Sequence, residues 1–204
     1  MKIAKPLQAR AHRTRNNILK AGVKLFAEKG FLGTSVNEIA FAAGNINKQR
    51  IYAYFGSKEH LFEEVLLHVF AEVELFSQKT LVAAEAHPEQ LTQLLLEGFM
   101  AVHANHGEFW RLLGWANLEK AVDPALIAAV STPENKAIRA VFEHAKEMGY
   151  VCDIDFESYL FTLLAVSYFF HSNAMTLSHT LSSTLFKEEG KERLIADLCS
   201  VFRK

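Results

Sequence analysis

Apolar residues recur at intervals of three and four along almost the whole chain, and this helical spacing most limits the folds it can adopt. No segment shows the strict alternation of apolar and polar residues that is typical of a half-buried strand. The few prolines and glycines stand mostly where helices are expected to end. The sequence therefore predicts an all-α protein with about nine helices.

The N-terminal part predicts three helices, of which two are short and joined by a tight turn. After a first helix over about residues 8–29, Thr34 is expected to cap the second helix. Gly44 and Asn45 then form a turn, because both residue types tolerate left-handed backbone angles. A third helix follows over about residues 46–54. This arrangement is typical of a helix-turn-helix unit, although any three short helices can form a bundle.

The rest of the chain predicts a larger helical body. Ser57 is expected to cap a long fourth helix, along which apolar residues recur at helical spacing as its inner face: Leu61, Phe62, Val65, Leu66, Val69 and Val73. Asp123-Pro124 and Thr132-Pro133 each have the form of an N-cap followed by proline at the first helical position, so a helix is predicted to start at both. A long, nearly uncharged helix is predicted over residues 155–177, and an amphipathic last helix over residues 187–204.

Charge is divided unevenly between these two parts. The whole chain has a net charge of −1. Residues 1–60 hold eleven Lys and Arg against three Glu, a net charge of +8, so the remainder carries −9. A basic head on an acidic body is expected of a protein whose head meets a polyanion. The charge division therefore predicts a DNA-binding domain over residues 1–58. Residues 59–204 form the other predicted domain, whose apolar last helices and aromatic-rich middle indicate dimerisation and ligand binding.

The third predicted helix carries side chains that suit the recognition of bases. Its N-terminal end, where a helix in the major groove meets base edges, holds Asn47, Lys48, Gln49 and Arg50 in succession. Lys and Arg match guanine O6 and N7, and Asn and Gln match adenine N6 and N7. A helical bundle that binds only proteins would leave this run and the charge of the head unexplained.

Several linked runs around these helices form one recognisable pattern. They are Ile18 to Gly30, Thr34 to Ala40, the turn Ala43-Gly44, and Ile51 to Glu59. In this order they resemble the signature of the TetR family of bacterial regulators. The resemblance implies a ligand-responsive repressor that binds a palindromic DNA operator as a homodimer and is released by a small molecule.

The resemblance also implies where double-stranded DNA is contacted. It places Thr34, Ser35 and Asn37 near phosphates. It places Lys48, Gln49 and Arg50 at base edges, and Tyr52, Tyr54 and Lys58 on the DNA backbone. The complete predicted DNA-binding set is Thr34, Ser35, Asn37, Asn47, Lys48, Gln49, Arg50, Tyr52, Tyr54 and Lys58.

Three residues of this region leave alternatives open. The spacing from the turn glycine to Tyr52 is one residue longer than the family's, and Asn45 is the apparent insertion. Tyr52 has an alternative place, packed inside the small bundle. Lys58 has an alternative as a solvated charge, but a cation in the first turn of a helix opposes the macrodipole, which favours a phosphate partner.

The last two predicted helices are the expected dimer interface. Residues 158–174 contain no charged side chain, and a helix that is apolar nearly all round must be buried on most sides. Two copies of the pair would form a four-helix bundle, as the family resemblance also implies. Burial of both helices within one chain is the alternative.

An aromatic-rich middle predicts an apolar pocket for an unidentified small organic ligand. The predicted ligand residues are Phe99, His103, Trp110, Trp115, Phe142 and Tyr168. For any one of them, a place in the core is the alternative. His103 and His106 lie one turn apart, but no Cys or Asp nearby in the sequence completes a metal site, so none is predicted.

Other classes of protein lack support in the sequence. It has no glycine-rich phosphate loop, no His-Glu-x-x-His helix and no Gly-x-Ser-x-Gly elbow, so no catalytic residues and no cofactors are predicted. No apolar run reaches the roughly 20 residues that cross a bilayer, and no secretory signal is visible. We expect a cytoplasmic protein without a membrane partner.

Overall fold

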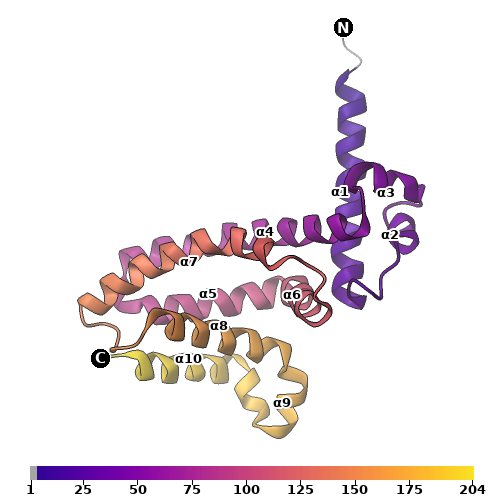
Figure 1. Cartoon of the computed structure of the whole chain (residues 1–204). Helices are drawn as coiled ribbons and strands as arrows, with labels where there is room; N and C mark the ends of the chain where they lie inside the picture. Colours follow the sequence, from indigo (N-terminus) through magenta and orange to yellow (C-terminus); the bar gives the residue numbers. More distant parts are fainter. Residues whose placement is uncertain (1–3) are drawn as a thin grey trace. The chain divides into compact units, whose positions relative to one another are not determined.

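The computed structural model describes the backbone of residues 4–204 and the side chains of residues 9–74 and 77–204. Over this range the chain is built from α-helices and two short 3₁₀ helices, without a strand (Figure 1). The prediction of an all-α fold is therefore confirmed. Lys2 and Lys5, which contribute to the predicted charge of the head, lie outside the described side chains.

The helices have the following bounds in chain order: α1 (Ala4–Lys29), α2 (Val36–Ala42), α3 (Lys48–Phe55), α4 (Lys58–Ala86), η1 (Pro88–Gln90), α5 (Leu91–Asn105), α6 (Gly107–Glu119), α7 (Pro124–Glu147), α8 (Phe156–Ser172), α9 (Ala174–Thr180), η2 (Ser183–Phe186) and α10 (Glu188–Phe202).

The chain folds as two compact units. The first is built from the residues up to Ala71 together with Glu108–Ala128, and the second from Glu72–Gly107 and Ala129–Lys204. Helices α4 and α7 each contribute residues to both units. The predicted functional boundary between residues 58 and 59 stays a prediction.

The first unit has a core shared by α1, α2, α3, the first half of α4 and α6. Ile18, Ile39, Ile51 and Leu112 are completely buried in it. The ring of Phe62 on α4 lies 4.9 Å from that of Phe26 on α1, centroid to centroid, in an edge-to-face arrangement. Burial of each such side chain contributes about 1.5–3 kcal/mol. The predicted inner face of α4 is confirmed, since all six residues are buried: Leu61, Phe62, Val65, Leu66, Val69 and Val73.

The second unit is organised around α5, which packs against α8 and α10 (Figure 1). Tyr159 of α8 is completely buried there, and its ring lies 4.8 Å from Phe142 and 5.1 Å from Phe202. The Tyr159 hydroxyl is within 2.9 Å of the Thr92 hydroxyl of α5, which satisfies both buried groups.

One predicted helix start is wrong. No helix begins at Thr132-Pro133, because α7 runs continuously through Pro133. A proline inside a helix removes one backbone hydrogen bond and crowds the preceding turn, but the flanking turns still form. The start predicted at Asp123-Pro124 is confirmed, since the Ala125 N–H donates to Asp123 Oδ1 at 2.9 Å.

The long helix predicted over residues 155–177 is interrupted. Asp155 caps its start by accepting hydrogen bonds from the N–H groups of Glu157 and Ser158. The helix then stops at Ser172, and α9 continues from Asn173 at an angle of 85°. An asparagine side chain competes with the helical backbone for hydrogen bonds, which makes it a natural break point.

In the described part of the chain, no single helix is long and apolar enough to cross a bilayer, and only α8 and α9 taken together reach that length.

Replacement of Pro133 by alanine tests the continuous α7. Inside a helix, proline costs about 3 kcal/mol relative to alanine, so Pro133→Ala should raise the free energy of unfolding by about 1–3 kcal/mol. Chemical denaturation followed by circular dichroism measures the change. Pro124→Ala is the matched control and should change little, since Pro124 occupies the first helical position. Equal effects of the two substitutions would contradict a continuous helix.

Candidate nucleic-acid interface

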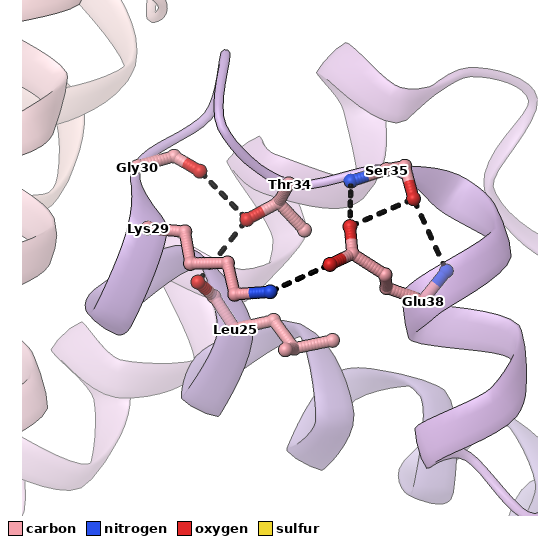
Figure 2. A network of polar contacts seen from close by, with 6 residues as sticks. All are labelled: Leu25, Lys29, Gly30, Thr34, Ser35 and Glu38. Carbon is pink, nitrogen blue, oxygen red and sulfur yellow. Dashed lines mark hydrogen bonds and ion pairs between the residues drawn. The ribbon is translucent and has the colours of Figure 1, made fainter.

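A network of polar contacts fixes the corner where α1 meets α2 (Figure 2). Ser35 is the N-cap of α2, since its Oγ accepts a hydrogen bond from the Glu38 N–H at 3.2 Å. The Glu38 carboxylate in turn accepts from the Ser35 N–H at 2.8 Å and from the Ser35 hydroxyl at 2.7 Å. This reciprocal capping box satisfies the first free N–H groups of α2.

Thr34 has a different place from the one predicted. It does not cap α2, because its side chain is 1% exposed and turns inward. Its hydroxyl lies 2.8 Å from the carbonyl oxygen of Gly30 and 3.1 Å from that of Leu25 (Figure 2). Gly30 ends α1 with a φ of +76°, a left-handed conformation that favours glycine. Thr34 therefore links the end of α1 to the start of α2.

An ion pair ties the same corner from outside. Lys29 Nζ lies 2.6 Å from Glu38 Oε1, and both side chains are about two-fifths exposed. The hydrogen bond from Lys29, together with those from Ser35, lowers the pKa of Glu38 to about 2. The same contact raises the pKa of Lys29. Both groups are therefore charged at neutral pH.

The turn between α2 and α3 contains two left-handed residues, as predicted. Gly44 has a φ of +104° and Asn45 a φ of +55°. Asparagine visits this region more readily than most residues, since its short side chain bonds locally. The Ile46 N–H donates to the Ala40 carbonyl at 2.9 Å, which closes the turn. Asn45, the apparent insertion, is thus accommodated inside the turn before α3 begins.

Helix α3 is anchored on one side and open on the other. Ile51 and Phe55 are buried in the core of the first unit. Asn47 caps the helix, because its Oδ1 accepts from the Gln49 N–H at 2.9 Å. The predicted base-reading residues Lys48, Gln49 and Arg50 are all exposed at the N-terminal end of the helix.

The remaining residues predicted to approach phosphates are also on the outside. Ser35 and Asn37 are exposed at the start of α2. Tyr52 is 45% exposed and Tyr54 is 37% exposed, so the alternative that Tyr52 packs inside the bundle does not hold. Apart from Thr34 and the half-buried Lys58, the predicted DNA-binding set is exposed to solvent.

Lys58 already has a partner within the unit. Its Nζ lies 4.3 Å from the centroid of the Phe31 ring, a cation–π contact. Phe31 packs in turn against Phe62, with 5.4 Å between ring centroids. The cation that opposes the α4 dipole is therefore held by an aromatic face, in the loop that joins α1 to α2.

Two residues of α6 hold this loop and the last turn of α1, and the sequence analysis assigned this role to neither of them. The Glu119 carboxylate accepts hydrogen bonds from the Phe31 N–H at 2.7 Å and the Leu32 N–H at 3.3 Å. The Trp115 Nε1–H donates to the Ala27 carbonyl at 3.3 Å. We call Trp115 and Glu119 the α6 clamp. The clamp and its partners are 87 or 88 residues apart in the chain, so no local pattern indicates them.

The predicted ligand residues have different surroundings. Trp110 and Trp115 belong to the first unit, and the guanidinium of Arg111 lies over the Trp110 ring. Phe142 is 1% exposed and packs in the core of the second unit, so the alternative of a core position holds for it.

Three of the predicted ligand residues lie elsewhere in the second unit. Phe99 lines a cavity of about 200 Å³ between α4, α5 and α7. His103 is buried beside Tyr168, with 5.9 Å between ring centroids, and burial lowers the pKa of His103 to about 4. Within the part of the chain that the structure describes, no group of three His, Cys, Asp or Glu side chains is arranged to hold a metal ion.

Helix α3 exposes long polar side chains and follows the capped helix α2 through a tight turn. This arrangement defines a helix-turn-helix protein.

Two family models match the chain. Residues 18–65 match the bacterial regulatory proteins of the tetR family, and residues 88–201 match the tetracyclin repressor-like C-terminal domain. The chain belongs to the TetR family of transcription regulators and is a DNA-binding regulator. Because this family regulates transcription, the prediction of a non-enzymatic role is confirmed.

Individual relatives agree with this assignment. The chain is 33% identical to the HTH-type transcriptional repressor NicS of Pseudomonas putida, over 89% of this chain and 86% of that protein. It is 32% identical to the HTH-type transcriptional repressor KstR2 of Mycolicibacterium smegmatis, over 46% of this chain and 45% of that protein. A TetR family transcription regulator from Marinobacter aquaeolei has the same fold, with a TM-score of 0.73 and 19% identity over 97% of this chain and 99% of that one.

The capping network makes the stability of the protein depend on pH. The lowered pKa of Glu38 means that its charged form stabilises the fold above about pH 4.5, and this contribution is lost as the pH falls towards 2. The difference in free energy of unfolding between the native protein and Glu38→Gln should therefore be full at pH 7 and shrink over that window. Denaturant titrations at a series of pH values measure it. A difference that stays constant down to pH 3 would contradict the network.

Proposed function

We propose that this chain binds a palindromic operator as a homodimer and represses transcription until a small organic molecule releases it. The observation that carries the proposal is the exposed N-terminal end of α3, set on the buried side chains of Ile51 and Phe55. Repression is supported by the similarity to the transcriptional repressor NicS over most of both lengths.

The DNA contacts we propose follow the exposure of each side chain. Lys48, Gln49 and Arg50 reach base edges in the major groove, where bidentate contacts discriminate between bases by about 1–3 kcal/mol each. Asn47 orients them as the cap of α3. Thr34, being buried, holds the corner between α1 and α2 and does not touch DNA.

The phosphate contacts we propose surround that surface. They come from Ser35, Asn37, Tyr52, Tyr54 and Lys58, of which Lys58 must exchange or share its contact with Phe31. Such contacts fix the register of the protein on the duplex without reading its sequence.

Dimerisation through α8 and α10 is supported by their two-sided apolar character. One side of α8 is buried inside the second unit, through Tyr159 and Leu163 among others. On its other side, Phe161 is 72% exposed and Phe169 is 52% exposed, and Val201 of α10 is 67% exposed. A four-helix bundle from two copies would bury these side chains and pair two heads for half-sites about one helical turn apart.

Two connections can carry a ligand signal to the head. The first is α4, which begins at Lys58 in the first unit and continues into the second, so that it can act as a lever. The second is the α6 clamp, whose hydrogen bonds end on the last turn of α1 and on the loop that follows it. A ligand that favours one position of these helices shifts operator affinity, and couplings of about 1–3 kcal/mol are typical.

Substitution of the base-reading side chains tests the DNA interface. Arg50→Ala and Lys48→Ala should each weaken operator binding by about 1–3 kcal/mol and relax discrimination between bases. Fluorescence anisotropy with operator and scrambled duplexes, at several salt concentrations, measures both effects. Lys136→Ala removes an exposed lysine from the body and is the matched control. The native protein should lose affinity steeply with salt, by about 0.9 logarithmic units per neutralised phosphate. Loss of binding in the control alone, or in none of the three, would refute the interface.

Substitution of Glu119 tests the clamp. Glu119→Gln keeps the shape of the side chain but weakens its charge-assisted hydrogen bonds, so hydrogen exchange of the Phe31 and Leu32 amides should accelerate by roughly tenfold. The operator affinity of the variant should fall as well. Glu108→Gln, an exposed position on the same helix, is the control. Unchanged exchange at both amides would remove the clamp from the mechanism.

A further inference from the structure

The cavity of the second unit has both a size and a charge, and these limit what it can hold. Its volume is about 200 Å³. A protein cavity of about 150 Å³ holds one benzene molecule, so this one has room for a single ring with a short substituent. Apolar walls come from three helices: Leu81 on α4, Leu95 and Phe99 on α5, and Ile138 on α7. These walls suit a hydrocarbon ring.

Two carboxylates interrupt the apolar lining. Glu74 extends from α4 and Glu134 from α7. The other polar side chains at the cavity are neutral: Ser77, Gln78 and Thr80. Among the described lining residues there is no Lys, Arg or His, so the formal charge at the cavity is negative.

The environment of Glu134 opposes a negative charge. Burial, in the first place, and the neighbouring Glu74 raise the pKa of Glu134, while the Ser77 hydroxyl partly offsets this. A carboxylate that is partly removed from water next to a second carboxylate gains from a cation placed between them. An anionic ligand would add a third negative charge to the same space.

We propose that this cavity binds a small organic cation, an amine carried on one hydrocarbon ring, with the ammonium group at Glu74 and Glu134. The inference rests on the proposed ligand response and specifies the chemistry of its ligand. The apolar walls bury the ring, and the two carboxylates accept hydrogen bonds from the ammonium group. Neutral ring compounds fit the same space but bring no positive charge to the two carboxylates.

Three probes of equal size and different charge test the proposal on the full chain. Benzylamine, benzyl alcohol and benzoate each carry one ring and are protonated, neutral and anionic, respectively, at neutral pH. Isothermal titration calorimetry should show that benzylamine binds at least tenfold more tightly than benzyl alcohol, and that benzoate binds weakest. Charge-assisted hydrogen bonds of this kind are worth roughly ten- to hundredfold in affinity.

Variants separate the charge from the fold. Glu134→Gln should lower benzylamine affinity by about tenfold while leaving benzyl alcohol unchanged. Glu147→Gln, an exposed position on the same helix, is the control and should leave both unchanged. Ala137→Leu should obstruct the cavity for both probes, since Ala137 lines it. Thermal melts of each variant confirm that it folds.

Several outcomes would overturn the inference: no benzylamine binding in the millimolar range, binding of benzoate or benzyl alcohol as tight as that of benzylamine, or an unchanged benzylamine affinity in Glu134→Gln. Operator binding by the ligand-free protein is measured in parallel. A protein that binds its operator but does not distinguish the probes keeps the proposed regulatory function and loses the cation site. A protein that fails to bind DNA but prefers benzylamine keeps the cation site and loses the regulatory function.

Discussion

The corner between α1 and α2 is the constraint on which the rest of the DNA-binding head depends. Helix α2 is short and has only two buried residues in its span, so packing alone holds it weakly. Its direction is instead set by hydrogen bonds: the capping box of Ser35 and Glu38, the inward hydroxyl of Thr34, and the ion pair of Glu38 with Lys29. Because α3 follows α2 through a tight turn, the direction of α2 also determines where α3 presents its exposed end.

The same corner is tied to α4 and α6 within the first unit. Lys58 of α4 lies over the ring of Phe31 in the loop after α1, and the α6 clamp bonds that loop and the last turn of α1. An alanine in place of Gly30 would bring its Cβ within 2.9 Å of Glu119 and of the Trp115 ring, which is closer than a side chain allows, so α6 can approach this far only because residue 30 is glycine. Within the first unit, α6 and the start of α4 are therefore both tied to the loop that precedes α2.

Prediction from sequence succeeded where the determining interactions are local. The inner face of α4 follows from its periodicity, and the turn at Gly44 and Asn45 from the backbone preferences of those residues.

Prediction from sequence failed where tertiary contacts determine the local structure. Thr34 and Ser35 are both good caps, and only the burial of Thr34 against α1 leaves the role to Ser35. Pro133 has the local form of a helix start but lies within α7. The partners of Trp115 and Glu119 are too distant in the chain for a pattern to reveal, and aromatic content alone does not separate Phe99 at the cavity from Phe142 in the core.

The central claim is that the N-terminal end of α3 reads bases in the major groove. Methylation interference tests it most directly, because dimethyl sulfate modifies guanine at N7 in the major groove and adenine at N3 in the minor groove. The account predicts that guanine methylation blocks binding in two clusters whose centres lie about one helical turn apart. Interference from adenine methylation alone, or a single cluster without two-fold symmetry, would contradict it.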